Sequence, residues 1–136
     1  MVKRWIFVIL LLIVLSVGCV LEHRFLDKSF GGLINNLETL QIELVENKES
    51  IDSEHLIAKA NDIHKVWHKD LKKIKCLIWH TWVKDIEIGL ARIAVYVSEN
   101  NYTEAYAEIG SLIDYASHYL KDFKISLENI LWCFLF

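Results

Sequence analysis

The chain of 136 residues contains no proline and only five glycines, which are scattered along it. Proline and clustered glycine are the usual signals that end helices and build flexible linkers, so neither signal is available here. The sequence also lacks a glycine-rich phosphate loop, a nucleophile elbow and a dinucleotide-binding fingerprint. We therefore expect a helical protein that is not an enzyme, needs no cofactor and has no evident small-molecule substrate.

Cysteine is scarce as well, with only Cys19, Cys76 and Cys133. An odd number of cysteines, one of them in an apolar N-terminal segment, does not predict a disulfide framework. A Cys76–Cys133 disulfide stays open, although a buried apolar role suits Cys76 better.

Positive charge is not in excess. The net charge of the chain is −3, and beyond Glu22 there are 13 Lys and Arg against 17 Asp and Glu, a charge of −4. A nucleic-acid-binding surface needs clustered cations, so the composition argues against a nucleic-acid partner.

The N-terminus carries an uncharged run from Trp5 to Leu21, preceded by Lys3 and Arg4. As a helix this run would be about 25 Å long, slightly short of a bilayer core of about 30 Å, which suits a short transmembrane helix or a signal peptide. The cations predict a cytoplasmic N-terminus. We expect residues 1–22 to be the membrane anchor or signal segment and residues 23–136 to form an extracytoplasmic helical domain.

The same segment allows a second interpretation. Its sequence "LSVGC" places Gly18 before Cys19, as in a bacterial lipoprotein signal, although Ser16 stands where leucine is usual and Leu15 comes one residue early. Lipidation at Cys19 is therefore an alternative to an uncleaved anchor. Both would hold the chain on the outer face of the membrane.

The rest of the chain has helical periodicity. Apolar residues recur at steps of three and four, the spacing of one buried helix face. They are Leu26, Phe30, Leu33, Leu37, Leu40, Leu44, Leu56, Ala60, Ile63, Trp67, Leu71, Ile74, Ile78, Ile86, Leu90, Ile93, Val97, Ala105, Ile109, Leu112, Ile113, Ala116 and Leu120. The predicted fold is all-α, with an N-terminal transmembrane or signal-anchor helix followed by a small antiparallel bundle of three to four helices.

Polar clusters mark the expected ends of these helices. Asp52 or Ser53 has the side chain of a helix N-cap, and Asn101 with Glu104 has the spacing of a capping box. Because the periodicity continues without a break, we expect one long helix, or two nearly collinear ones, from Ser53 to Ser98. Gly89 and the segment "WHTW" are the expected bends, and Gly31-Gly32 is expected to soften the junction with the anchor.

The C-terminal segment Ile130–Phe136 is a run of seven apolar residues. It is too short to span a bilayer. It either closes the core of the bundle or returns to the membrane interface, which Trp132 and Phe134 would favour.

The stretch "HKVWHKDLKKIKCLIWH" raises the question of a metal site. His64 and His68 lie on adjacent turns of one helix face. Cys76 is about 18 Å from His64 along the same helix, which is too far for one ion to bind both. His64 and His68 are therefore metal-site candidates only if another helix supplies a ligand, such as His55, His118 or a carboxylate. We expect no metal, and a metal-binding or sensory domain is the alternative function.

Two further groups of side chains have the composition of possible sites. Trp79 and Trp82 cannot both face the buried stripe, so at least one of them is a candidate for contact with a partner. Asp85 and Glu87 are two residues apart and point to different sides of a helix, so they do not form a catalytic pair. Glu87 is expected to pair with Arg92 or Lys84 on the surface.

The segment "KDIEIGLARIAVYVSENNYTEAYAEIGSLIDYA", with Trp67, His80 and "SLENIL", resembles the bacterial family named domain of unknown function 4363. The resemblance covers nearly the whole chain. It implies a membrane-anchoring segment followed by a helical region, a spore-forming Gram-positive source and no established activity. The chain departs from the family in its ending "WCFLF" and in Trp82, where acidic residues are common.

The resemblance also implies a partner, because family members are encoded near a multi-pass membrane protein. Together with the anchor, this predicts a single-pass protein of the cell membrane that contacts a membrane protein or an envelope complex. Protein–protein interaction is the expected function.

Overall fold

The computed structural model describes residues 2–74 and 80–135, and within them the side chains of residues 3–73 and 83–122. This part of the chain consists of four helices and contains no strand. They are α1 (Val2–Glu46), α2 (Glu54–Ile74), α3 (His80–Ser98) and α4 (Tyr102–Leu135). The prediction of an all-α chain, in which an apolar N-terminal helix leads into a helical bundle, is confirmed.

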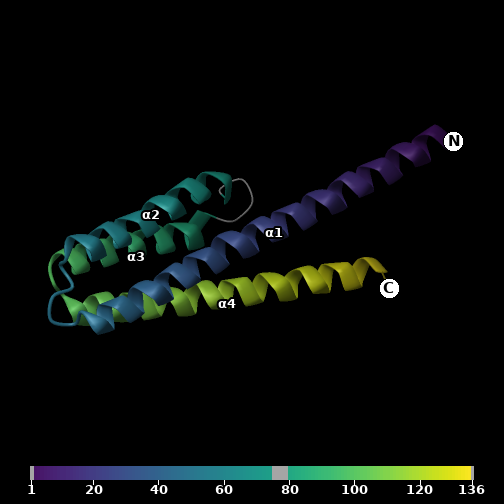
Figure 1. Cartoon of the computed structure of the whole chain (residues 1–136). Coiled ribbons are helices and arrows are strands. Elements are labelled where there is room, and N and C mark those ends of the chain that lie inside the picture. Colours follow the sequence, from purple (N-terminus) through teal and green to yellow (C-terminus); the bar gives the residue numbers. More distant parts are fainter. Residues whose placement is uncertain (1, 75–79, 136) are drawn as a thin grey trace.

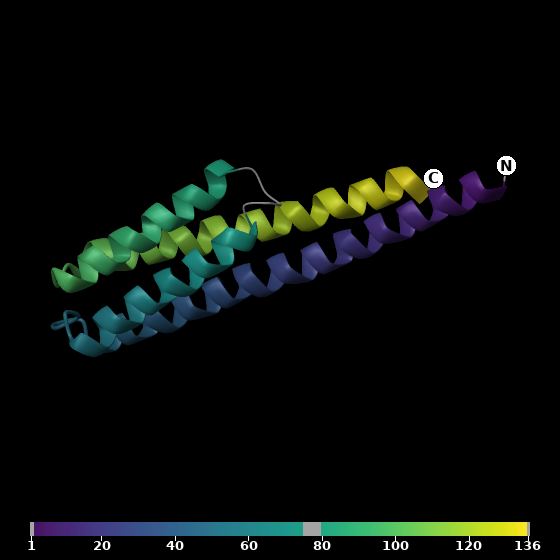
Figure 2. The same cartoon turned by 90° about the horizontal axis from the view of Figure 1, so that it is seen from above.

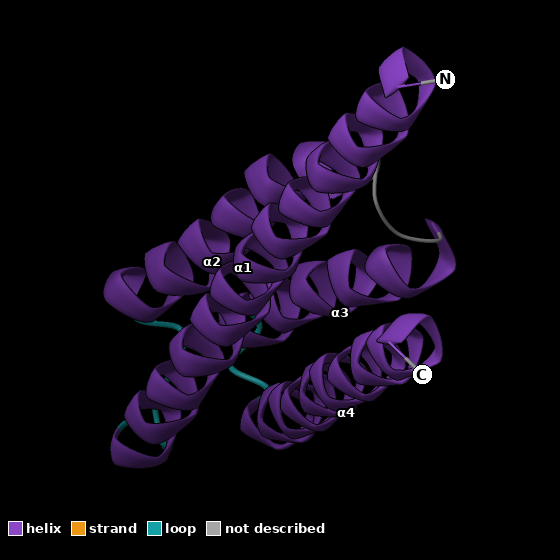
Figure 3. Cartoon of the chain, turned by 90° about the vertical axis from the view of Figure 1, so that its right-hand side faces the viewer, coloured by secondary structure: helices purple, strands orange, loops and turns teal. Residues whose placement is uncertain are grey.

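The helices form an antiparallel bundle. Each packs against the next in sequence, and α4 closes the ring by packing against α1 (Figures 1 and 3). The long helices α1 and α4 continue past the ends of α2 and α3, so both termini project from the same end of the molecule (Figures 1 and 2). We call this the proximal end, and the end with the α1–α2 and α3–α4 turns the distal end.

The expectation of a long or nearly collinear helix over residues 53–98 is wrong. The chain reverses direction between Ile74 and His80, so α2 and α3 lie side by side and antiparallel (Figure 1). The "WHTW" segment lies at this reversal, whereas Gly89 lies within α3. Periodicity did not reveal the reversal, because a stripe that faces the same core keeps its three- and four-residue steps on both sides of a turn.

Gly89 is required by packing. A methyl group added at Gly89 would lie 2.7 Å from Leu112 Cδ2 of α4, which is closer than carbon atoms approach each other. The glycine therefore allows α3 and α4 to pack closely, and α3 continues through it without interruption.

The core consists of the predicted stripes. All six stripe residues of α1 from Leu26 to Leu44 are at most 4% exposed. Trp67 of α2 is 2% exposed, and its ring packs edge-on against Phe30 with the centroids 5.2 Å apart. Phe30 also stacks on Tyr119 of α4 at 5.0 Å. These three aromatic side chains join α1, α2 and α4 at one level of the bundle.

Side-chain caps and a cross-turn contact stabilise the distal end. Ser53 Oγ accepts a hydrogen bond from the Leu56 N–H at 3.4 Å, and Asn101 Oδ1 accepts one from the Glu104 N–H at 3.3 Å. Both predicted N-caps are thus present, with Ser53 rather than Asp52 capping α2. Each cap satisfies an N–H group that has no partner within its helix.

Asn100 connects the two distal turns. Its backbone has φ 55°, the left-handed conformation that ends many helices, and the Asn101 N–H donates to Tyr96 O at 2.8 Å. The Asn100 side-chain oxygen accepts a hydrogen bond at 2.9 Å from the N–H of Ile51, a fully buried residue of the other turn. One asparagine therefore both ends α3 and joins the α3–α4 turn to the α1–α2 turn.

Candidate functional site

The N-terminal half of α1 has no buried face. Every described side chain from Lys3 to Leu21 is exposed, including the whole uncharged run that begins at Trp5. Among the described helices, α1 alone is long and apolar enough to cross a membrane, a property shared by membrane anchors and signal sequences. It continues without a break through Gly31-Gly32 into the bundle.

Cys19 lies on this exposed part of α1 as a free thiol. It is two residues before Leu21, the last residue of the uncharged run. The proposed lipidation site thus lies near the bundle end of the apolar segment.

The two metal candidates of α2 converge on a carboxylate of α3. His68 Nδ1 lies 2.6 Å from Glu87 Oε1, and His64 Nε2 lies 3.6 Å from the same oxygen. Glu87 was expected to pair with Arg92 or Lys84, but Arg92 pairs with Glu108 of α4 at 3.8 Å. A carboxylate of the neighbouring helix therefore completes the pair, one of the ligand types that the sequence left open.

The geometry of this cluster favours a direct contact over a metal ion. At 2.6 Å His68 and Glu87 are already in hydrogen-bond contact, and no ion fits between them. Over the described residues, no group of three or more His, Cys, Asp or Glu side chains is arranged to hold a metal. The other proposed ligands lie elsewhere: His55 contacts Glu43, and His118 contacts Asp114 of its own helix.

Asp85 and Glu87 point to different sides of α3, as predicted. The Tyr115 hydroxyl of α4 lies 3.5 Å from Asp85 Oδ2, whereas Glu87 faces α2. Burial raises the pKa of Tyr115, with a further contribution from the negative charge of Asp85. The two carboxylates therefore belong to different helix interfaces.

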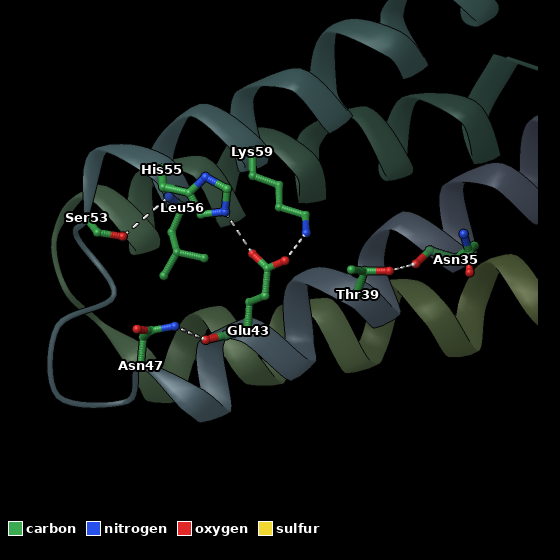
Figure 4. A network of polar contacts seen from close by, with 8 residues as sticks. All are labelled: Asn35, Thr39, Glu43, Asn47, Ser53, His55, Leu56 and Lys59. Carbon is green, nitrogen blue, oxygen red and sulfur yellow. Dashed lines mark hydrogen bonds and ion pairs between the residues drawn. The ribbon is translucent and has the colours of Figure 1, made fainter.

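A second polar cluster lies between α1 and α2 near the distal end (Figure 4). Glu43 of α1 forms an ion pair with Lys59 Nζ and lies 3.3 Å from His55 Nε2, both on α2. The hydrogen bond from Lys59 is the largest effect on Glu43, and it holds the pKa of that carboxyl group below its ordinary value of 4.5. The cluster connects α1 with α2, and neither of its two contacts was predicted from the sequence.

Both clusters follow from position beside the buried stripe. On α2, His55 and Lys59 directly precede the stripe residues Leu56 and Ala60, and they face α1. The following positions face α3 instead, since His64 and His68 come directly after Ile63 and Trp67. In helix bundles the residues that flank the apolar stripe meet the flanking residues of the neighbouring helix. This rule could have predicted both clusters once the reversal between α2 and α3 was known.

A groove of about 460 Å³ lies between α1 and α2 towards the proximal end. Its lining combines the rings of Phe25 and Trp67 with Lys28, Asp70 and Lys73. A smaller hollow of about 290 Å³ continues it, and both are lined by Val66, which is 55% exposed.

The partner-contact candidates cannot be placed. Trp79 lies outside the described residues, and the side chain of Trp82 lies outside the described side chains. Cys76 also lies outside the described residues, and the side chains of the apolar C-terminal run lie outside the described side chains. Sequence remains the basis of these predictions.

Comparison with protein families supports the resemblance noted in the sequence. The model of the family described as Domain of unknown function (DUF4363) matches residues 20–130. The chain belongs to this family. Within this DUF4363 protein the match covers the bundle and excludes most of the apolar segment at each end. No curated protein and no solved structure matches the chain.

Proposed function

We propose that this DUF4363 protein is a single-pass membrane protein whose bundle lies outside the cytoplasm. It acts without catalysis, as an interaction module or accessory subunit of a membrane or envelope complex. The observation that supports this proposal is the continuity of α1, which runs without a break from an apolar segment exposed on all sides into the bundle core.

The energetics of α1 support the membrane assignment. Burial of apolar surface contributes about 25 cal/mol per Å², so an uncovered run of large apolar side chains is costly in water. A helix that is apolar on all sides suits a bilayer, and one with a single apolar stripe suits a bundle. Because α1 contains both patterns, it would hold the bundle close to the membrane surface.

The predicted orientation follows from the charges. Lys3 and Arg4 precede the apolar run and favour a cytoplasmic N-terminus. The test uses a chain whose three native cysteines are replaced by alanine, expressed in cells that are then converted to protoplasts. We expect a membrane-impermeant thiol reagent to label Ser117→Cys in these protoplasts. Val2→Cys in the same background should react only after permeabilisation. Labelling in the reverse order would contradict the orientation.

The mode of attachment has its own test. We expect mass spectrometry of the mature protein to find the segment from Met1 to Cys19 intact, because the chain is held by an uncleaved anchor. A mature chain that begins at an acylated Cys19 would replace the anchor with a lipid. A mature chain that begins after Leu21 without a lipid would overturn membrane attachment.

The groove between α1 and α2 is the surface we assign to a protein partner, because it opens beside the proximal end and combines aromatic with charged side chains. A photo-crosslinking residue at Val66 should capture the same membrane or envelope protein in repeated preparations of native membranes. Val95 of α3 is a matched control, since the two valines are 55% and 50% exposed. Equal capture at both sites, or none at Val66, would contradict this assignment.

The cluster of His64, His68 and Glu87 favours a second candidate, a metal-binding or sensory domain. A metal ion would have to displace the direct contact between His68 and Glu87. Calorimetric titration of the metal-free full-length chain in detergent with zinc, nickel and copper tests this candidate. Binding that is lost in Glu87→Gln would support it, and no binding at micromolar concentrations would remove it.

A further inference from the structure

Beyond the four-helix region the C-terminal part of α4 and the N-terminal part of α1 diverge, but both extend from the proximal end (Figures 1 and 3). Helix α4 continues to Leu135, and its end projects from the proximal end of the molecule, as the apolar half of α1 does (Figures 1 and 2). The last charged residue of the chain is Glu128, and the seven residues from Ile130 onward are all apolar. The level that this segment reaches relative to α1 determines what surrounds it.

Two contacts between α1 and α4, and a third from Lys48 just after the end of α1, define the register of the two helices. Lys48 Nζ lies 5.1 Å from the centre of the Tyr102 ring. A methyl group added at Gly110 would lie 3.8 Å from Gln41 Nε2, and the rings of Phe30 and Tyr119 stack at 5.0 Å. In these pairs the two residue numbers add up to 150, 151 and 149. One residue forward along α4 therefore corresponds to one residue backward along α1, over the whole shared length.

The numbering relation is continued towards the C-terminus with a rise of about 1.5 Å per residue along each helix, whose axes diverge at this end (Figures 1 and 3). It places Glu128 level with about residue 22 of α1, which is Glu22, the first acidic residue after the uncharged run. Ile130 is then level with about residue 20, and Leu135 with about residue 15. The two helices thus change from charged to apolar sequence at the same height.

We propose that residues 130–135 of α4 enter the outer leaflet of the membrane at the proximal end, where the anchor also leaves the bundle, and contact lipid acyl chains. The proposal rests on the proposed membrane location of α1. The helical residues 130–135 rise about 9 Å, so the segment reaches roughly a third of the way into a hydrocarbon core of about 30 Å. The chain would therefore be held by one spanning helix and one short inserted helix end.

The register between α1 and α4 supports lipid as the surroundings of the C-terminal end of α4. At the height of residues 15–20 the exposed side chains of α1 are uncharged and, apart from Ser16, apolar, so the surroundings that suit them also suit the apolar end of α4. Trp132 is of a residue type that is common at membrane interfaces. Closure of the bundle core, the alternative drawn from the sequence, is not favoured, because α2 and α3 end before this level (Figure 2).

Site-directed spin labelling of the full-length chain tests the proposal. Cys133 is kept as the single cysteine by Cys19→Ala and Cys76→Ala, labelled with a nitroxide and reconstituted into vesicles of phosphatidylethanolamine and phosphatidylglycerol. Collision rates with oxygen and with a water-soluble nickel chelate are then compared. We expect oxygen to be favoured at Cys133, because oxygen concentrates in the acyl-chain region and the chelate stays in water.

Two matched labels separate the possible results, each in the chain without native cysteines. Ser117→Cys on the exposed side of α4 should favour the chelate, and Leu12→Cys in the anchor should favour oxygen. If Leu12→Cys favours oxygen and Cys133 favours the chelate, or is shielded from both reagents, the insertion of α4 is overturned while the anchor stands. If Leu12→Cys favours the chelate, the anchor and the insertion both fail.

Discussion

The two halves of α1 are one continuous helix but are built for different surroundings. From Leu26 to Leu44 the helix buries one stripe of six residues and exposes its remaining faces, because α2 and α4 cover only part of its circumference. From Trp5 to Leu21 there is no stripe, and all sides are apolar and exposed. The comparison shows that one continuous helical backbone can carry two distributions of apolar residues, a single stripe where other helices cover it and apolar residues on all sides where none do.

The same contrast holds along α4. Its first half buries Ala105, Ile109, Leu112 and Ala116 against the bundle, and its sequence becomes entirely apolar after Asn129. Because α1 and α4 are antiparallel, the two changes occur at the same end of the molecule. A bundle region and a region of apolar sequence therefore meet at one boundary, near Glu22 of α1.

The largest expected difference between the two regions is in the effect of removing a leucine side chain. Leu37→Ala should lower the free energy of unfolding by about 2 to 5 kcal/mol, because Leu37 is fully buried and the change leaves a cavity. Leu12→Ala makes the same chemical change at a residue that is 52% exposed, and should stay within about 0.5 kcal/mol of wild type. Denaturant titration in detergent, followed by circular dichroism, measures both. Equal effects would abolish the contrast.

A smaller difference is expected from adding a methyl group. Gly89→Ala would place a carbon atom 2.7 Å from Leu112 Cδ2, whereas Gly31→Ala meets no atom within 4 Å. Both changes gain helix propensity, so overpacking should leave Gly89→Ala less stable than Gly31→Ala by about 1 to 3 kcal/mol. The thermal unfolding midpoints of the two variants give this difference. A Gly89→Ala midpoint at or above that of Gly31→Ala would mean that α3 and α4 pack less tightly than described.

The distal turns should be sensitive to Asn100. Asn100→Gly keeps the left-handed backbone but removes the acceptor for the Ile51 N–H, which should cost about 1 kcal/mol. Asn100→Asp keeps an oxygen acceptor and should recover most of this loss. Hydrogen exchange of the Ile51 amide reports the contact directly, and unchanged protection in Asn100→Gly would show that the two turns are not joined by this side chain.

The smallest expected effect is the pH dependence contributed by Glu43. Because its pKa is lowered in the folded state, ionised Glu43 stabilises the protein above its ordinary pKa of 4.5, and this contribution is lost as the pH falls through the folded pKa. Glu43→Gln should be less stable than wild type at pH 7 by less than about 1 kcal/mol, with the gap closing below about pH 4.5. Unfolding at several pH values, with exposed Glu38→Gln as control, would falsify this if the gap stayed constant.

The sequence predicted the two histidines of the His64, His68 and Glu87 cluster but not the carboxylate. The i, i+4 spacing of His64 and His68 placed both on one helix face, but nothing in the spacing identified Glu87 as their common neighbour. Arg92 and Lys84, the partners suggested for Glu87, lie on its own helix, whereas the contacts of Glu87 come from His64 and His68 of α2. Glu43 was not singled out, because its partners His55 and Lys59 approach it from another helix.

The sequence by itself determined the helical class, the buried stripes, the two N-caps and the apolar N-terminal segment. These features depend on local chemistry, since helix periodicity, capping side chains and a long uncharged run act over a few turns of one helix. Only the tertiary structure decided where the chain reverses between α2 and α3, which carboxylates meet the histidines and how α4 is aligned with α1. Such features depend on which helix faces meet across the bundle, and the same stripe is compatible with several arrangements until packing selects one.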